Sequence, residues 1–191
     1  DIQYDSIRIN LSLNQKDHQL KAHLMAPNIR HKESSVEGML FTANGDTENL
    51  NFDFRFSELN SDPIKIPKTT LLGEFKAQTA FLDFIISDAG SKLMQVKSEI
   101  HANDSGIVYH INPDSLLLNS SSWNILPGNE LLFSEKAIVA KDFDLTRLGQ
   151  ELVLRTQKNK SNKEILELIF DNFELSTLTN YQSRGARQQI A

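Results

Sequence analysis

Apolar and polar residues alternate with a period of two over much of this chain. In the clearest segment, 50–56, one leucine and three phenylalanines occupy every second position, with asparagine, aspartate and arginine between them. Successive side chains of a β-strand point to opposite faces, so this pattern predicts strands with one apolar and one polar face. The same alternation occurs in segments 7–13, 20–24, 107–111, 151–155 and 166–170.

Turn-forming residues separate these segments. Asn44-Gly45-Asp46 is a strong hairpin signal, and similar stretches occur at 14–17, 88–91, 103–106, 127–129 and 158–162. Their spacing is typical of an antiparallel meander. We therefore predict an all-β fold, an elongated, curved and largely antiparallel sheet with an apolar concave face that forms an open β-groove. Strand should exceed about 40% of the chain and helix should stay below about 15%.

Three stretches are less regular. Segment 75–86 fits a strand or a short amphipathic helix equally well, and Pro63 to Pro67 is interpreted as a loop within one sheet. Leu175 to Leu178 predicts the start of a short helix with Ser176 as its cap. We expect a single segment over residues 1–182 and a frayed tail over 183–191.

The ends of the sequence favour a piece of a larger protein. It begins at Asp1 without an initiator methionine, and it contains no signal-peptide core and no apolar run of the roughly 18 residues that a membrane helix needs. Any membrane anchor or targeting signal is therefore expected outside these residues.

Composition excludes several functional classes. The 191 residues include no cysteine, which rules out disulfides, a cysteine nucleophile and thiolate metal sites. The net charge is −5 and the lysines and arginines are scattered, so we expect no nucleic-acid partner. No phosphate-binding loop, nucleophile elbow or zinc-protease motif is present. We predict a protein that is not an enzyme, with no catalytic residues and no cofactor.

Two pairs of polar residues could indicate a metal or catalytic site, but each pair has a simpler structural interpretation. His18 and His23 follow one turn and could pair on a metal, but solvated strand histidines are far commoner, so no metal is expected. Asp142 and Asp144 alternate with Phe143 and Leu145, which predicts solvent-facing carboxylates and not an acid–base pair.

The apolar faces allow two interpretations, an ordinary closed sandwich core or an open surface that holds alkyl chains. In both, the residues between them, such as Arg8, Asn51, Asp53, Arg55, Glu151 and Arg155, should face solvent. In the open interpretation, the apolar positions line one continuous groove for lipid. The predicted lining is Ile7, Ile9, Leu11, Leu13, Leu20, Leu24, Leu50, Phe52, Phe54, Phe56, Leu152, Leu154, Leu166, Leu168 and Phe170.

A family resemblance favours the open interpretation. Residues 123–133 read Trp-Asn-Ile-Leu-Pro-Gly-Asn-Glu-Leu-Leu-Phe, and an apolar strand and a Gly-Gln strand follow up to Thr156. This region resembles the TamB family of Bacteroidota-type envelopes. Residues 168–178, which read Leu-Ile-Phe-Asp-Asn-Phe-Glu-Leu-Ser-Thr-Leu, are similar to the repeated ending of that family. The resemblance covers residues 123–178 and depends on strand patterning.

The resemblance implies a periplasmic segment of a protein anchored in the inner membrane. Proteins of this family, like the similar AsmA-like bridge proteins, have an elongated sheet with a greasy inner surface thought to carry phospholipid to the outer membrane. Their expected partners are phospholipid acyl chains and an outer-membrane barrel-assembly protein of the TamA or BamA type, with a role in protein translocation and assembly. A closed β-sandwich that acts as a structural or adhesion module of a cell-envelope protein remains the alternative.

Overall fold

Two antiparallel β-sheets make up most of the molecule. The computed structural model describes residues 2–135, 137–159 and 164–177, with 71% strand and 3% helix. Neither sheet closes into a barrel, and the prediction of an all-β, largely antiparallel fold is confirmed. The expected tail over 183–191 lies outside the described residues.

The larger sheet, sheet A, has fifteen strands and contains every strand up to residue 141. Its main path runs β1-β3-β4-β5-β8-β9-β10-β11-β14-β15, while β2 pairs with the first half of β3 and the β6–β7 hairpin extends the sheet beside β4. The strands are β1 (Ile2–Tyr4), β2 (Arg8–Asn14), β3 (Gln19–His31), β4 (Ser34–Gly45), β5 (Asn49–Phe56), β6 (Glu58–Ser61), β7 (Ile64–Ile66), β8 (Thr69–Lys76), β9 (Thr79–Asp88), β10 (Ser91–Asn103), β11 (Gly106–Ile111), β12 (Leu117–Leu118), β13 (Ser121–Ser122), β14 (Glu130–Phe133) and β15 (Ile138–Lys141).

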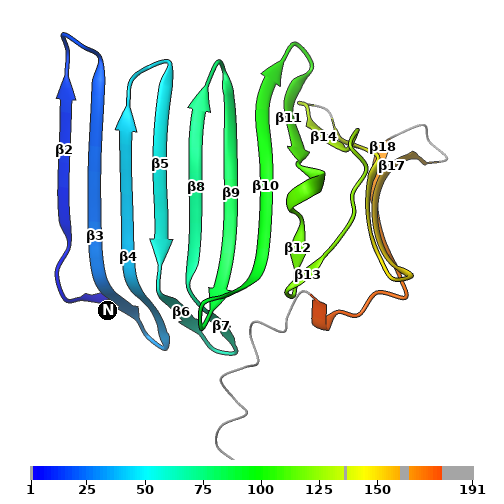
Figure 1. The fold of residues 1–191 in the computed structure, drawn as a ribbon, viewed down its shortest axis with the longest axis horizontal. Helices are drawn as coiled ribbons and strands as arrows, with labels where there is room; N and C mark the ends of the chain where they lie inside the picture. Colours follow the sequence, from blue (N-terminus) through cyan, green and yellow to red (C-terminus); the bar gives the residue numbers. More distant parts are fainter. Residues whose placement is uncertain (1, 136, 160–163, 178–191) are drawn as a thin grey trace, which may run out of the picture.

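The smaller sheet, sheet B, has three strands in the order β16-β17-β18. They span Phe143–Arg147, Gln150–Lys158 and Glu164–Asp171. A 3-10 turn, η1 (Pro113–Ser115), follows β11 and begins at Asn112, whose side chain accepts a hydrogen bond from the backbone of Asp114. In Figure 1, β2 to β5 and β8 to β10 lie side by side, β6 and β7 lie at one end of these strands, and sheet B lies at the end of the molecule where β11 and β14 are found.

The structure shows the conformation of the three less regular stretches. Segment 75–86 is strand and not helix: Ala77 and Gln78 adopt positive φ in a tight turn between β8 and β9. The stretch from Pro63 to Pro67 stays within one sheet, but its middle forms β7 rather than a loop. Ser176 is already helical, and the preceding Glu174 carbonyl accepts from the Thr177 amide at 2.8 Å, so the assignment of Ser176 as the cap is wrong. Leu178 lies outside the described residues.

Strand register sorts the side chains of sheet A onto two faces. Cross-strand partners share a face, and one row of partners runs through seven strands as Ile9, Leu24, Phe41, Phe54, Leu71, Phe84 and Val96. We call the face that carries this row the apolar face. The row one residue away is Asn10, His23, Thr42, Asp53, Leu72, Asp83 and Lys97, and we call its face the polar face.

The hydrophobic core cluster of the described residues forms at the C-terminal end of the apolar face, while single residues such as Ala26, Ala43 and Ile86 are buried elsewhere on it. Ile111, Leu116, Leu118, Trp123, Ile125, Phe143 and Leu145 are its buried members. Sheet A contributes Val96, Tyr109, Leu131 and Ala140 from its apolar face, and sheet B contributes Leu152 and Leu154. Sheet B therefore covers the apolar face over β10 to β15, and we call this part the closed end.

The turn between Trp123 and β14 holds the closed end together. Asn129 is fully buried, and its side chain accepts from the Ile111 amide and donates to the Ile111 carbonyl, both at 2.8 Å. It also donates to the Leu126 carbonyl at 2.7 Å. A side chain therefore takes the place of a partner strand at the end of β11 and leaves no buried backbone group there unpaired.

Candidate functional site

The candidate site is the part of the apolar face that lies over β2 to β9, which we call the open face. Figure 1 shows β2 to β5, β8 and β9 side by side, and the hydrophobic core cluster of the described residues lies outside this part of the sheet, although Ala26 and Ile86 are buried at the ends of their strands. Ile9, Leu11 and Leu13 are 67%, 71% and 65% exposed, although they alternate as regularly as buried strand residues. Apolar side chains that neither packing nor a partner removes from water form a binding surface or an aggregation liability.

Three parallel rows of apolar residues build the open face. The first runs through Phe54, as described above. The second is Leu11, Ala22, Ala43, Phe52, Gly73 and Leu82, and the third is Leu13, Leu20, Gly45, Leu50, Phe75 and Ala80. No charged residue interrupts these rows, so the surface is uniformly apolar along and across the strands.

Phenylalanine rings form the middle of the open face. Phe41 and Phe52 lie with ring centroids 6.5 Å apart, and Phe54 and Phe56 lie 6.2 Å apart edge to face. These distances are within the range at which aromatic pairs attract each other. All four rings are only partly buried, so the pairs order the surface without removing it from solvent.

Gly73 allows Phe52 to lie flat against the neighbouring strand. A Cβ atom at Gly73 would come within 2.1 Å of two ring carbons of Phe52. Any larger residue would therefore push the ring away from the sheet. The second row combines this glycine with Ala22 and Ala43, so its side chains at these three positions are small.

The residues expected from the sequence to line one groove divide between the two sheets. Ile9, Leu11, Leu13, Leu20, Leu24, Leu50, Phe52, Phe54 and Phe56 lie on the open face. Ile7 precedes β2 and is outside its paired register. Leu152 and Leu154 pack in the closed end, while Leu166, Leu168 and Phe170 share their face of sheet B on the outer strand β18.

Several residues of the open face were missed from the sequence. Phe41, Leu71 and Phe84 share the row of Phe54. In β8 and β9 the alternation is hidden because Leu72 and Phe81 add large apolar side chains to the polar face. The register with β5 would have found them, because each lies directly across from a residue of a recognised stripe.

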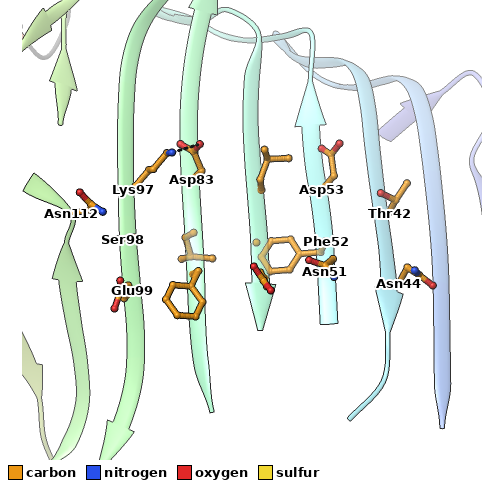
Figure 2. A pocket seen from close by; sticks show the side chains of 15 residues that line it. Thr42, Asn44, Asn51, Phe52, Asp53, Asp83, Lys97, Ser98, Glu99 and Asn112 are labelled. Carbon is orange, nitrogen blue, oxygen red and sulfur yellow. Dashed lines mark ion pairs between the residues drawn. The ribbon is translucent and has the colours of Figure 1, made fainter. Parts of the chain in front are cut away.

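The polar face of the same strands carries a shallow hollow of ≈ 530 Å³, shown in Figure 2. Its side chains include the carboxylates of Asp53, Glu74, Asp83 and Glu99 and a single cation, Lys97. Carboxylates therefore predominate within this hollow, while Arg8, Lys21, Arg55 and Lys76 lie elsewhere on the same face.

Hydrogen bonds and ion pairs fix some of these carboxylates in place. The two oxygens of Asp83 accept from Gln95 Nε2 at 2.9 and 3.1 Å, and Lys97 Nζ lies 4.0 Å from Oδ2. Asp53 Oδ2 lies 3.8 Å from Arg55, whereas its buried Oδ1 has no hydrogen-bond partner. No group of three or more histidine, aspartate or glutamate side chains in the described part of the chain is arranged to hold a metal ion.

Acidic side chains fix two turns at the borders of the open face. Backbone amides of Asn49 and Glu48 donate to Asp46 at 2.8 Å and hold the pKa of this carboxyl below its usual value. At the β6–β7 hairpin, Lys65 Nζ lies 2.9 Å from Glu58 Oε2 and lowers the pKa of Glu58. Both carboxylates stabilise local structure and lie outside the apolar rows.

Comparisons with known proteins add no identification. No family model, curated protein or solved structure matches this chain. Within the described residues, the structure also contains no helix that is long and apolar enough to span a bilayer. Function is therefore inferred from the geometry of the open face together with the sequence resemblance.

Proposed function

We propose that this chain is a non-catalytic segment whose open face holds the acyl chains of lipids. One observation supports the proposal: three rows of apolar residues without a charged side chain extend across β2 to β5, β8 and β9, outside the hydrophobic core cluster of the described residues. In the closed end, sheet B buries the continuation of the same rows. The open face thus has the apolar side chains of a hydrophobic core without a second protein layer in the described structure, and an alkyl chain is apolar enough to pack against it in place of that layer.

The hydrophobic effect gives such a surface a useful affinity. Each methylene group that moves from water to an apolar surface gains roughly 0.8 kcal/mol when fully buried. An acyl chain of about 16 carbons lying on one face is buried on one side only, so it gains a part of that sum. The rows offer no deep pocket to fix the chain at one place, and the lipid can move along the face.

The resemblance to the TamB family supports a more specific role. In this role the chain is a periplasmic segment of a protein anchored in the inner membrane, and its open face forms part of a path for phospholipid to the outer membrane. The same resemblance supports contact with a barrel-assembly protein of the TamA or BamA type.

A structural or adhesion module is the second candidate, and the closed end favours it. There, two layers and a loop enclose a core around Trp123 in the manner of an ordinary sandwich. If a further protein layer covers the open face in the same way, that face is core and not a binding site. The two candidates therefore differ in what contacts Phe54.

Photo-crosslinking tests the proposal directly. A photoreactive phenylalanine analogue at position 54 is expected to capture lipid from an extract, and native mass spectrometry of the detergent-free protein should show retained lipid. Phe54→Asp should fold, because water reaches the open face, and should lose most lipid binding. Asn51→Asp adds the same charge to the other face of β5 and should bind lipid like the unchanged protein.

The outcomes separate the two candidates. A folded Phe54→Asp variant with undiminished lipid binding would contradict the proposed site. An unfolded Phe54→Asp variant would favour a closed sandwich, since a carboxylate that water cannot reach is too costly to bury.

A further inference from the structure

We propose that the hollow on the polar face binds an aliphatic polyamine, a flexible alkyl chain that carries several ammonium groups. The hollow lies over β4, β5 and β8 to β10, within sheet A and on the face opposite the open face. Its volume of ≈ 530 Å³ is within the range of sites for small molecules. The proposal does not depend on lipid binding.

Phe81 lies between two carboxylates in one row of cross-strand partners. Glu74 on β8 and Glu99 on β10 are its direct neighbours on the same face. Phe81 is 39% exposed, and neither glutamate has an ion pair or a side-chain hydrogen bond within the described residues. An aromatic ring attracts a cation to its face, and carboxylates accept charge-assisted hydrogen bonds from an ammonium group. The row therefore presents an aromatic surface with an unpaired anion on each side.

The neighbouring row repeats this arrangement, with Leu72 between Asp53 and Asp83. Leu72 is 40% exposed, so both rows leave apolar surface in water. Asp53 Oδ1 is buried and accepts no hydrogen bond from the described residues. A donor that enters the hollow and reaches Asp53 would satisfy this acceptor. Exposed apolar side chains, an unpaired acceptor and free carboxylates together fit a ligand that is both aliphatic and cationic.

The spacing of the two free glutamates favours a ligand with a cation at each end. Neighbouring strands lie about 4.8 Å apart, so the Cα atoms of Glu74 and Glu99, two strands apart, are separated by roughly 10 Å. The end nitrogens of extended spermidine are separated by a similar distance. With one end at each glutamate, the methylene groups lie across Phe81 and the inner ammonium group lies over its ring.

The charges around the hollow favour a small ligand over a basic protein surface. Lys21, Arg55 and Lys76 lie elsewhere on the same face and would repel a broad basic surface that covered the hollow. The cation that lines the hollow itself, Lys97, already lies 4.0 Å from Asp83 (Figure 2). A polyamine is narrow enough to contact the carboxylates without covering the outer cations.

Titration of the full chain with spermidine tests the site. Calorimetry measures the dissociation constant, and amide NMR shifts locate the ligand. We expect the shifts to concentrate on the residues of β5 and β8 to β10 that line the hollow. Propylamine, which carries one ammonium group, should bind roughly tenfold more weakly or worse, because it cannot contact both glutamates at once.

Substitutions in the hollow should change the affinity in opposite directions. Glu74→Gln and Glu99→Gln each remove one anion and should raise the dissociation constant roughly twofold to fivefold. Phe81→Leu keeps an apolar side chain but removes the ring, and should raise it by a similar factor, roughly twofold to fivefold. Lys97→Gln removes the competing cation and should lower it. Circular dichroism checks that each variant folds, as expected for partly exposed positions on one face of a sheet.

The matched control lies in a second hollow, of ≈ 570 Å³, on sheet B. Carboxylates also line this hollow, but none of its cross-strand rows places an aromatic ring between two of them. Its charged residues are Asp142, Asp144, Glu151, Arg155 and Asp171. Glu151→Gln removes the same charge as Glu74→Gln and should leave spermidine binding unchanged.

Three results would overturn the polyamine site. Equal NMR shifts in both hollows, or an equal loss of affinity with Glu151→Gln, would show only the general attraction of an acidic chain for a polycation. Tighter binding of trilysine than of spermidine would assign the hollow to a basic protein segment instead. Absence of binding would remove the site altogether. Phe54→Asp, on the other face, should bind spermidine normally, so failure of the lipid proposal is measured separately.

Discussion

The closed end and the open face are built from the same kind of strand, but only one of them is a core. Val96 continues the row of Phe54 and Ile111 continues the row of Phe52, yet both pack against the Trp123 cluster. The same rows over β2 to β5, β8 and β9 lie outside the hydrophobic core cluster of the described residues. Alternation therefore identifies an apolar face, while the elements that follow along the chain determine whether other residues cover that face.

The largest effect is expected from truncation of the residue at the centre of the closed end. Trp123 is 2% exposed, and its ring lies 5.4 Å from that of Phe173. Trp123→Ala should lower the free energy of unfolding by about 3–5 kcal/mol, measured by chemical denaturation followed by circular dichroism. Trp123→Phe keeps most of the packing and removes the buried, unpartnered Nε1, so it should cost clearly less. Equal losses in both variants would contradict a core closed around this ring.

A matched pair of leucines compares the two regions directly. Leu145 is buried in the closed end, whereas Leu11 is exposed on the open face. Leu145→Ala should cost about 2–5 kcal/mol of unfolding free energy. Leu11→Ala, measured at a concentration where the chain is monomeric, should change it by no more than about 0.5 kcal/mol. Similar costs at the two positions would mean that a protein layer also covers β2.

The next effect concerns the buried hydrogen bonds of the closed end. Asn129→Ala removes the partners of both backbone groups of Ile111 and leaves them buried. We expect a loss of about 1–3 kcal/mol. Amide hydrogen exchange should show faster exchange at Ile111 and unchanged exchange in β5. If exchange accelerates equally in both strands, Asn129 stabilises the whole molecule and not the closed end.

The smallest effect is expected at low pH, at the border of the open face. Lys65 lowers the pKa of Glu58 from its usual 4.5. The ionised carboxylate therefore stabilises the β6–β7 hairpin above pH 4.5, and this contribution is lost as the pH falls through the lower, folded-state pKa. An exposed ion pair contributes at most about 1 kcal/mol.

Hydrogen exchange in β6 and β7 measures this contribution. Exchange in the hairpin should accelerate below pH 4.5 relative to the closed end. The control Glu58→Gln should abolish the difference, because it has no carboxyl group to titrate. Faster exchange at higher pH in the hairpin alone would contradict the sign of the effect.

The sequence was sufficient to predict the strands that have one apolar and one polar face. Segment 50–56 corresponds to β5, and the Asn44-Gly45-Asp46 signal marks the end of β4. Such strands are predictable because the polarity of each residue indicates which face of the strand it occupies. In β9, Phe81 and Ile85 face one side while Leu82 and Phe84 face the other, so the period is lost and helix could not be separated from strand.

The division of the apolar face could not be predicted from alternation. Leu152 and Leu154 alternate as Leu50 and Phe52 do, but the former pair lies in a core and the latter on an uncovered surface. The difference arises from Trp123, Ile125 and Asn129. These residues lie in a stretch without regular alternation of apolar and polar residues, where packing and side-chain hydrogen bonds fix the conformation of the chain. The proline, glycine and asparagine at 127–129 indicated a turn, but not that Asn129 is buried within it.

The most direct test of the account is to ask which side chains an acyl chain touches. Stearic acid with a nitroxide on its alkyl chain broadens the NMR signals of methyl groups close to it. We expect strong broadening of Leu24 and Leu71 on the open face, and little at Leu118, Ile125 and Leu145 in the closed end. Equal broadening of both groups, or broadening of neither, would contradict an open face that binds lipid.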